Sequence, residues 1–429
     1  MKRRALWLIG AGTLLVAGAA YGTIWGGNGS ALLDPLATAT VGRGPVAIAL
    51  DDRTGRAFVV NYLDTTISVL DTRRGRVVRT LGLNPRGRGA RLVAIAVDTR
   101  IDRAYAASWG FAARPTTSAF ASTITTITIL DARRAFVVKA VSLPGRVRDV
   151  AVDERGGRVF VLTDRNAATH GAVSALDAAS GALLCTVPVG PSPVALAIDR
   201  QAGRLLVVNQ GLPMPGAFMA AGTVSVLDAR TGRLVRAVPV GSRPMGIAID
   251  ERTGRAFISN NVGGLISVLD TRAGRLLATR AVGPTPDAMA VDQQAGHLFV
   301  ADVAANTVSM LDARSGAVLR TVRVGIRPLV VAVDARAHRV LVANDVSGTV
   351  SVLDSVTGAA LRTVRVGLDP QDAAVDERVG RAFILNLTAD GERPSGLPLV
   401  NRIQALFRRI TSQPARDPIG SVSVLDMTH

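Results

Sequence analysis

Cysteine is nearly absent from this chain of 429 residues, and aromatic side chains are scarce. The one cysteine, Cys185, has no second cysteine in the chain to pair with, so an apolar interior must hold the fold. Only 4% of the residues are aromatic although 48% are hydrophobic, which leaves valine, leucine, isoleucine and alanine to build that interior. This length allows two or three ordinary domains or one large repeat architecture.

Lysine is almost as rare, because Lys2 and Lys139 are the only two, and arginine supplies the other 48 of the 50 basic side chains. The formal net charge is +17, or +14 without Lys2, Arg3 and Arg4. Such an excess attracts anions, including nucleic acid, acidic glycans and lipid headgroups. Abundant Ala, Arg, Gly and Val with little Lys is also typical of a GC-rich genome, and composition alone then explains the charge.

Motifs of known catalytic sites are missing as well. The four histidines lie far apart, without the spacing of metal ligands: His170, His297, His338 and His429. The sequence has no CxxCH haem attachment, no GxSxG elbow and no glycine-rich phosphate loop after a strand. It therefore predicts no cofactor, no metal site and no catalytic residues.

The first 25 residues carry three cations followed by an uncharged run from Ala5 to Trp25. This pattern is typical of a signal peptide, with Ala17-Gly18-Ala19 as the cleavage site, or of an uncleaved membrane anchor. We expect an exported chain, periplasmic or at the cell surface, that is secreted or anchored by this segment. Residues 26–35 are predicted to be a linker.

Residues 36–429 consist of eight copies of one unit. Each unit has four short, β-branched runs separated by turns that contain glycine, which is the pattern of strands. Four strands in 42 to 55 residues is typical of a β-propeller blade. The sequence therefore predicts an all-β fold, an eight-bladed propeller of four-stranded blades.

Three positions recur in every unit. Two are aspartates that open turns, and sixteen of the 33 acidic residues occupy them: Asp51, Asp98, Asp153, Asp199, Asp250, Asp292, Asp334 and Asp376, then Asp71, Asp131, Asp177, Asp228, Asp270, Asp312, Asp354 and Asp426. We expect their carboxylates to accept turn N–H groups. The third is an alanine, expected where the innermost strands of neighbouring blades crowd together and leave room only for a small side chain: Ala49, Ala96, Ala151, Ala197, Ala248, Ala290, Ala332 and Ala374.

The last unit stops after its third strand, "SVSVLD", while "LATATVG" near residue 36 matches the fourth strand of other units. We expect residues 36–41 to supply the missing outer strand. The ring would then close by pairing its N- and C-terminal strands, which protects both sheet edges.

The second run of each unit ends in "FVVN", "LVVN", "FISN", "LVAN" or "FILN" in five of the copies. Together with the "SVLDxxxG" and "VGxxP" elements, these endings resemble the YVTN family of β-propeller repeats over nearly all of residues 36–429. The resemblance implies an exported, largely non-catalytic propeller. Some members of the family resemble nucleic-acid-binding periplasmic proteins. Members often have seven blades, whereas eight are counted here.

The two aspartate turns should share one face of the ring, together with many arginines: Arg53, Arg56, Arg73, Arg74, Arg252, Arg255, Arg272 and Arg275. A solvated surface of paired charges is the simpler interpretation, and a polyanion site is the alternative.

The longest insertions fall between second and third strands, on the opposite face, at residues 108–123, 164–171, 209–222 and 387–420. A face that carries such insertions is often the one that binds. Trp109, Phe111 and Phe218 would lie on it, either covering one another or contacting a partner. The last insertion contains a predicted amphipathic helix at 397–411, whose arginines are Arg402, Arg408 and Arg409. We expect this helix to lie apolar side down as a lid, or to touch a membrane or partner.

Polar residues also stand where three innermost strands begin, at the mouth of the central channel. These are Arg148 and Asp149, Gln371 and Asp372, and Asp287. They are candidates for binding a ligand, or simply line a wet pore.

These observations favour a monomeric, non-catalytic platform that binds an unknown protein or glycan partner on the face with the long loops. Two alternatives stay open. One is arginine-mediated binding of polyanions such as nucleic acid, and the other is a metal-dependent enzyme that uses Asp149, Asp287 and Asp372 at the channel mouth.

Overall fold

The computed structural model describes residues 32–83, 85, 88–111, 123–164, 171–212, 221–388 and 419–427. All regular structure in these ranges is β-strand. The predicted signal or anchor segment (1–25) and the predicted helix (397–411) lie outside the described residues. Within the described ranges, none of the chain forms a helix with the length and hydropathy needed to span a bilayer.

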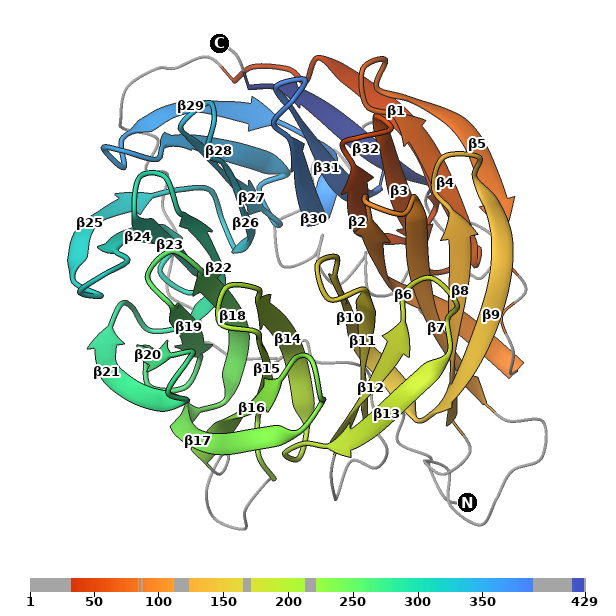
Figure 1. Ribbon diagram of the computed structural model, residues 1–429. Helices are drawn as coiled ribbons and strands as arrows, with labels where there is room; N and C mark the ends of the chain where they lie inside the picture. The colour runs from red at the N-terminus through yellow and green to blue at the C-terminus, as the bar shows by residue number, and fades with distance from the viewer. Residues whose placement is uncertain are drawn as a thin grey trace, which may run out of the picture. The chain divides into compact units, whose positions relative to one another are not determined.

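Eight antiparallel sheets of four strands each form a ring, so the predicted eight-bladed β-propeller is confirmed (Figure 1). Blades 1 to 4, each from its innermost strand outward, are β2 (Pro45–Asp51), β3 (Arg56–Asn61), β4 (Thr66–Asp71), β5 (Arg76–Gly82); β6 (Arg88–Asp98), β7 (Arg103–Phe111), β8 (Thr123–Asp131), β9 (Phe136–Pro144); β10 (Arg146–Asp153), β11 (Arg158–Asp164), β12 (Gly171–Asp177), β13 (Leu183–Pro188); β14 (Pro193–Asp199), β15 (Arg204–Asn209), β16 (Ala221–Asp228), β17 (Leu234–Ser242). Blades 5 to 8 are β18 (Pro244–Asp250), β19 (Arg255–Asn260), β20 (Leu265–Asp270), β21 (Arg275–Ala281); β22 (Pro286–Asp292), β23 (His297–Asp302), β24 (Thr307–Asp312), β25 (Val318–Arg323); β26 (Pro328–Asp334), β27 (Arg339–Asn344), β28 (Thr349–Asp354), β29 (Ala360–Arg365); β30 (Leu368–Asp376), β31 (Arg381–Thr388), β32 (Ile419–Asp426), β1 (Ala37–Arg43).

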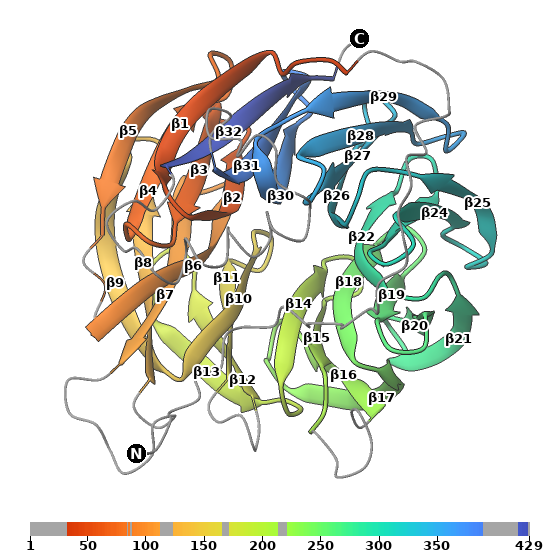
Figure 2. The same ribbon diagram turned by 180° about the vertical axis from the view of Figure 1, so that it is seen from behind.

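The two ends of the described chain close the ring, as predicted. Strand β1 pairs with β32 in register Ala39↔Val422, and both views of the ring show the two strands side by side in blade 8 (Figures 1 and 2). The segment before β1, which was predicted to be a linker, also pairs: Leu33 bridges to Val364 at the outer edge of blade 7. Each of these contacts covers a sheet edge that would otherwise be open.

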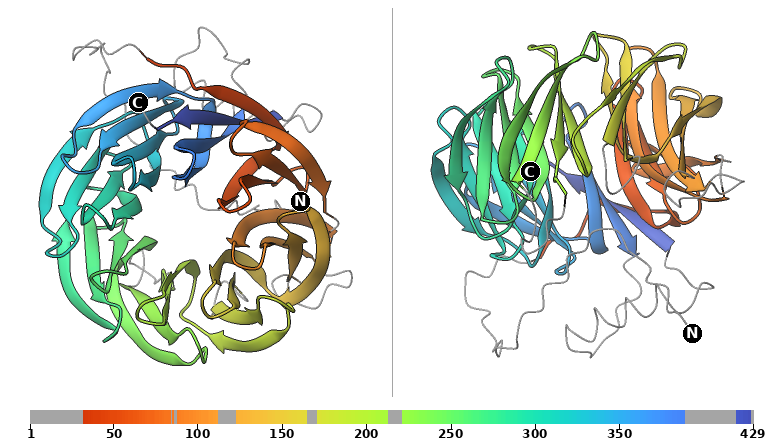
Figure 3. Two further views of the ribbon diagram at one scale, coloured as in Figure 1. Left: turned by 45° about the horizontal axis from the view of Figure 1, so that its top comes forward. Right: turned by 90° about the horizontal axis from the view of Figure 1, so that it is seen from below.

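The core is divided among the boundaries between blades. Each of the eight apolar clusters joins two neighbouring blades, and the innermost strands of neighbouring blades contact one another around the whole axis (Figure 3). The second strand supplies a fully buried aromatic ring at one position in six blades: Phe58, Tyr105, Phe160, Phe257, Phe299 and Phe383. The recurrent alanines are half-buried on the innermost strands, where Ala49 packs against the cluster shared with blade 2.

The antiparallel order within each blade separates two faces of the ring. We call the face with the two aspartate turns of each blade (residues 51–56 and 71–76 in blade 1) the hairpin face. The face with the connections from second to third strand (61–66 in blade 1) and the links between blades is the loop face. On the hairpin face, the carboxylate of Asp51 accepts the N–H of Thr54 at 3.0 Å, and that of Asp270 accepts the N–H of Ala273 at 2.8 Å. The same bond recurs at the other first-turn aspartates, which confirms their role in the turns.

The asparagine that ends the second strand is fully buried in five blades, beneath the loop face. In blade 5 the Nδ2 group of Asn260 donates to Oγ of Ser267 at 3.0 Å, and equivalent bonds form at Asn61, Asn209, Asn344 and Asn386. A Cβ atom on Gly241 would lie only 2.7 Å from Cγ of Asn260. The glycine of the "VGxxP" link therefore leaves the space that the asparagine of the following blade occupies.

Candidate functional site

The loop face carries a row of aromatic and arginine side chains across blades 1 to 3. Arg91 lies over the ring of Tyr62, with Cζ 5.5 Å from the ring centroid, and Arg91 pairs across the strands with Trp109. The Cζ atom of Arg146 lies 4.2 Å from the centroid of Trp109, and the Phe111 ring meets Trp109 edge to face at 5.7 Å. We call these five residues the aromatic–arginine cluster.

This arrangement corrects one detail of the sequence analysis. The insertion was predicted to begin at residue 108, but β7 continues to Phe111 and β8 resumes at Thr123, so Trp109 and Phe111 lie on a strand. Strand pairing fixes the direction of both side chains, and Trp109 is half-buried while Phe111 is 46% exposed. The cluster therefore holds Trp109 in place and presents Phe111 to solvent.

Arg146 is the basic centre of this cluster. Burial lowers the pKa of its guanidinium, and the nearby Arg148 lowers it further. Arg148 forms an ion pair with Asp164, with Nη2 2.9 Å from Oδ2. This charge was predicted to line the channel mouth, and the structure shows that it is compensated within its own blade.

Asp149 and Asp372 occupy equivalent positions on the innermost strands of blades 3 and 8. Oδ2 of Asp149 accepts the N–H of Leu196 in blade 4 at 3.1 Å, and Oδ2 of Asp372 accepts the N–H of Ile48 in blade 1 at 3.0 Å. Burial raises the pKa of both carboxyl groups to about 6, against the opposing effect of these backbone bonds. Both acids thus connect neighbouring blades.

The third predicted acid, Asp287 in blade 6, lies in a different electrostatic setting. Burial raises the pKa of its carboxyl group, while Arg243 and Arg327 oppose that rise. Within the described ranges, the chain contains no group of three or more acidic, histidine or cysteine side chains that could hold a metal ion. Asp149, Asp287 and Asp372 are therefore not brought together as a metal centre.

An acidic pair that the sequence analysis did not single out lies near the same mouth. Burial raises the pKa of Asp369, and the carboxyl of Asp345, to which it is hydrogen-bonded, raises it further. Arg327 pairs with Asp345, with Nη1 2.8 Å from Oδ2. Gln371, a predicted site residue, is exposed and donates to the carbonyl of Asp369 at 3.1 Å.

Three charged residues that the sequence did not indicate as site residues each stand before a proline, where one blade leads to the next. Arg243 and Arg327 each stand directly before the proline that opens an innermost strand, and Asp369 stands before Pro370 within β30. All three have a positive φ, between 49° and 60°. The residue that precedes proline in each link between blades differs in type from blade to blade. That variation was the signal by which the sequence could have identified these residues. The predicted site residues Phe218, Arg402, Arg408 and Arg409 lie outside the described residues.

Comparison with known proteins finds one matching family and several structures with a similar fold. A family profile described as "Choice-of-anchor I domain" matches residues 111–336. No curated protein matches the sequence. Among solved structures, the chain is similar to the Dos1 propeller, with a TM-score of 0.63 and 11% identity, over 82% of this chain and 92% of that one. It is also similar to hydrazine synthase of Kuenenia stuttgartiensis, with a TM-score of 0.55 and 15% identity, over 78% of this chain and 100% of that one. At these identities the likeness shows the propeller fold alone.

Proposed function

The chain belongs to the choice-of-anchor I domain family, and on that basis we propose that it is an exported, surface-associated propeller that acts as a non-catalytic binding platform. The family name refers to an anchor, which supports attachment at the cell surface. The apolar run at residues 5–25 would secrete or anchor the chain. We also propose that the units are YVTN repeats, on the basis of strand endings such as Phe58 to Asn61.

The observation that carries the proposal is the aromatic–arginine cluster on the loop face. Phe111 is 46% exposed and meets Trp109 edge to face, and the Trp109 ring in turn lies against the guanidinium of Arg146. An exposed aromatic ring positioned in this way is a pre-organised contact surface for a sugar ring or an apolar side chain. The longest insertions leave the blades on this face, in blades 2, 3, 4 and 8. We propose that a protein or glycan at the cell surface binds here.

Rigidity supports the same function. Every blade contacts both neighbours through a buried apolar cluster, and β1 and β32 close the ring. A closed ring of this kind holds the loop ends at fixed distances, so a ligand bound there meets a surface that is already formed.

The test is binding of the labelled full chain to intact cells of the organism that encodes it and to immobilised polysaccharides from its envelope. We expect Phe111→Ala to weaken binding about tenfold, as for an aromatic residue at the centre of an interface. The matched control is Phe136→Ala, since Phe136 is 40% exposed in the same blade but begins β9 at the hairpin face.

Equal binding by the wild-type chain and Phe111→Ala would contradict the assignment of the loop face. Loss of binding in Phe136→Ala alone would show that the partner contacts the hairpin face instead of the loop face. Turnover of a small substrate by the purified chain would contradict the non-catalytic part of the proposal.

A further inference from the structure

Blades 1 and 5 share an arrangement of four arginines on the hairpin face. Their first turns read Arg-Thr-Gly-Arg and their second turns Thr-Arg-x-Gly-Arg, and among the eight units only these two have arginine at all four positions: Arg53, Arg56, Arg73 and Arg76 in blade 1, and Arg252, Arg255, Arg272 and Arg275 in blade 5. The two turns of a blade lie on the same face, so the four arginines of each of these blades stand on the hairpin face.

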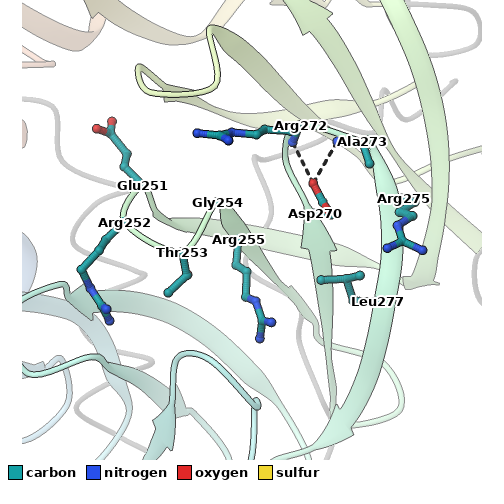
Figure 4. Close-up of a pocket in the computed structure, with 10 residues that line it drawn as sticks. All are labelled: Glu251, Arg252, Thr253, Gly254, Arg255, Asp270, Arg272, Ala273, Arg275 and Leu277. Carbon is teal, nitrogen blue, oxygen red and sulfur yellow. Dashed lines mark hydrogen bonds between the residues drawn. The ribbon is translucent and has the colours of Figure 1, made fainter.

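A hollow lies at each of these two places. The hollow in blade 5 has a volume of about 400 Å³ and lies between its two turns, lined by the four arginines, Thr253 and Leu277, among others (Figure 4). The hollow at blade 1 has a volume of about 380 Å³ and is lined by Arg53, Thr54, Arg56 and Arg133 of blade 2, but not by Arg73 or Arg76. Arg53 forms an ion pair with Asp102 of blade 2, so Arg56 is the arginine of this hollow that resembles Arg255.

Within the described residues, neither acid that lines the blade 5 hollow forms an ion pair with Arg255 or Arg275. Glu251 pairs with Arg200 of blade 4, at 3.4 Å between Oε1 and Nη1, and it points away from Arg252 and Arg255 in Figure 4. Asp270 accepts the N–H groups of Arg272 and Ala273, drawn as dashed lines in the same figure.

The arginine that begins the second strand distinguishes these blades from the others. In blade 4, Arg204 pairs with Asp228 at 3.1 Å, and in blade 2, Arg103 pairs with Asp131 at 3.4 Å. In blades 3 and 8, Arg158 and Arg381 donate to carbonyl groups of the next blade. Within the described ranges, Arg56 and Arg255 have neither kind of partner, and both line the hollows.

We propose that the hollows in blades 1 and 5 bind a tetrahedral oxyanion, a phosphate or sulfate group. Guanidinium groups without a carboxylate partner bind such oxygens through paired, charge-assisted hydrogen bonds. Arg255 and Arg275 supply these bonds in blade 5. Arg252 lies beside them, with its Nε donating to the carbonyl of Gln293 at 3.1 Å and its Nη2 3.8 Å from Oδ2 of Asp250. The site lies on the face opposite to the proposed partner surface, so it adds a second binding function.

The test compares Arg255→Gln with Arg204→Gln in the full chain. Arg204 occupies the equivalent position in blade 4, is half-buried like Arg255, and already has a carboxylate partner. Inorganic phosphate and sulfate are titrated by calorimetry at low ionic strength, and thermal unfolding of each variant checks the fold. We expect saturable binding at two sites. Arg255→Gln should weaken the blade 5 site about tenfold, Arg56→Gln should weaken the blade 1 site to the same degree, and Arg204→Gln should leave both unchanged. The double variant Arg56→Gln/Arg255→Gln should be weakened at both sites.

A second arm distinguishes the source of the phosphate group. Each variant is tested for flotation with vesicles that contain an anionic lipid with a phosphate headgroup and with vesicles that lack it. All variants carry the same N-terminal segment, so any membrane binding by that segment is the same in each. Binding of inorganic phosphate that depends on Arg255 assigns the site to a free oxyanion. Binding only to anionic vesicles, again dependent on Arg255, assigns it to a lipid headgroup. Equal behaviour of Arg255→Gln and Arg204→Gln in both arms, or binding in neither, would overturn the proposal.

Discussion

The carboxylate of Asp372 accepts a hydrogen bond from the backbone N–H of Ile48 at 3.0 Å, across 324 positions of the sequence and the boundary between blades 8 and 1. Asp149 makes the equivalent bond to Leu196 between blades 3 and 4. Both acids therefore connect blades, and one of them does so where the chain ends meet. A carboxylate in this position stabilises the ring through its acceptor oxygens, although burial disfavours its charge.

Substitutions at Asp372 should separate the stabilising effect of its acceptor oxygens from the cost of burying its charge. Asp372→Ala leaves the N–H of Ile48 without this acceptor, and we expect a loss of about 1–3 kcal/mol in the free energy of unfolding. Asp372→Asn keeps an acceptor oxygen and removes the buried charge, so its stability at neutral pH should equal or exceed that of the wild-type chain. Urea unfolding of the two variants measures the difference. Equal losses in both would show that the charge itself holds the blades together.

The stability of the ring should depend on pH through the same groups. Burial raises the pKa of Asp372 from 3.8 to about 6, so the folded chain binds more protons than the unfolded chain between these values. The contribution of such a group is fully present below its unfolded pKa and is lost as the pH rises through its folded pKa. We expect a higher urea midpoint at about pH 5 than at about pH 7, and a smaller difference in Asp149→Asn/Asp372→Asn. A midpoint that rises with pH over this range, or an unchanged difference in the double variant, would contradict this assignment.

The glycine of the link should tolerate no side chain. A methyl group on Gly241 would lie 2.7 Å from Cγ of the fully buried Asn260, so we expect Gly241→Ala to cost about 1–3 kcal/mol. Gly82→Ala is the control, because nothing lies within 4 Å of a Cβ atom there. It should be neutral or stabilise the chain by a few tenths of a kcal/mol. Thermal unfolding of both variants tests this, and equal midpoints would mean that Asn260 can move aside.

Closure of the ring by β1 can be tested with two neighbouring substitutions. Ala39 is buried between blades 8 and 1, whereas Thr38 on the other face of the strand is exposed. Ala39→Asp places an unpaired charge in the cluster and should cost at least 3 kcal/mol, while Thr38→Asp should change stability by less than about 0.5 kcal/mol. Similar denaturation curves for the two variants would show that β1 contributes little to the ring.

The sequence predicted the fold more fully than the site because different physical facts determine them. Repeated spacing and turn chemistry belong to every unit, so the blade count, the closing strand and the role of acids such as Asp51 could all be inferred. The bonds of Asp149 and Asp372 to the next blade accompany a shift of register in their innermost strands, which no residue type signals. The lack of an ion pair at Arg255 among the described residues is likewise not signalled by residue type, because Asp270 stands in the position of Asp131 and Asp228, which pair with the equivalent arginines of blades 2 and 4.

Ion pairs between arginines and carboxylates limit how strongly the net charge of +17 attracts nucleic acid. On the hairpin face Arg103, Arg204 and Arg339 each lie within 4 Å of a carboxylate of their own blade. We therefore expect the full chain to bind double- and single-stranded DNA weakly at about 50 mM salt and not measurably at about 200 mM, as for a few phosphate contacts. Tight binding with a steep dependence on salt would instead favour a polyanion-binding protein. Replacing Arg402, Arg408 and Arg409 by glutamine would then identify the source. Loss of binding in this triple variant assigns it to the last insertion, and loss in Arg56→Gln/Arg255→Gln assigns it to the two hollows.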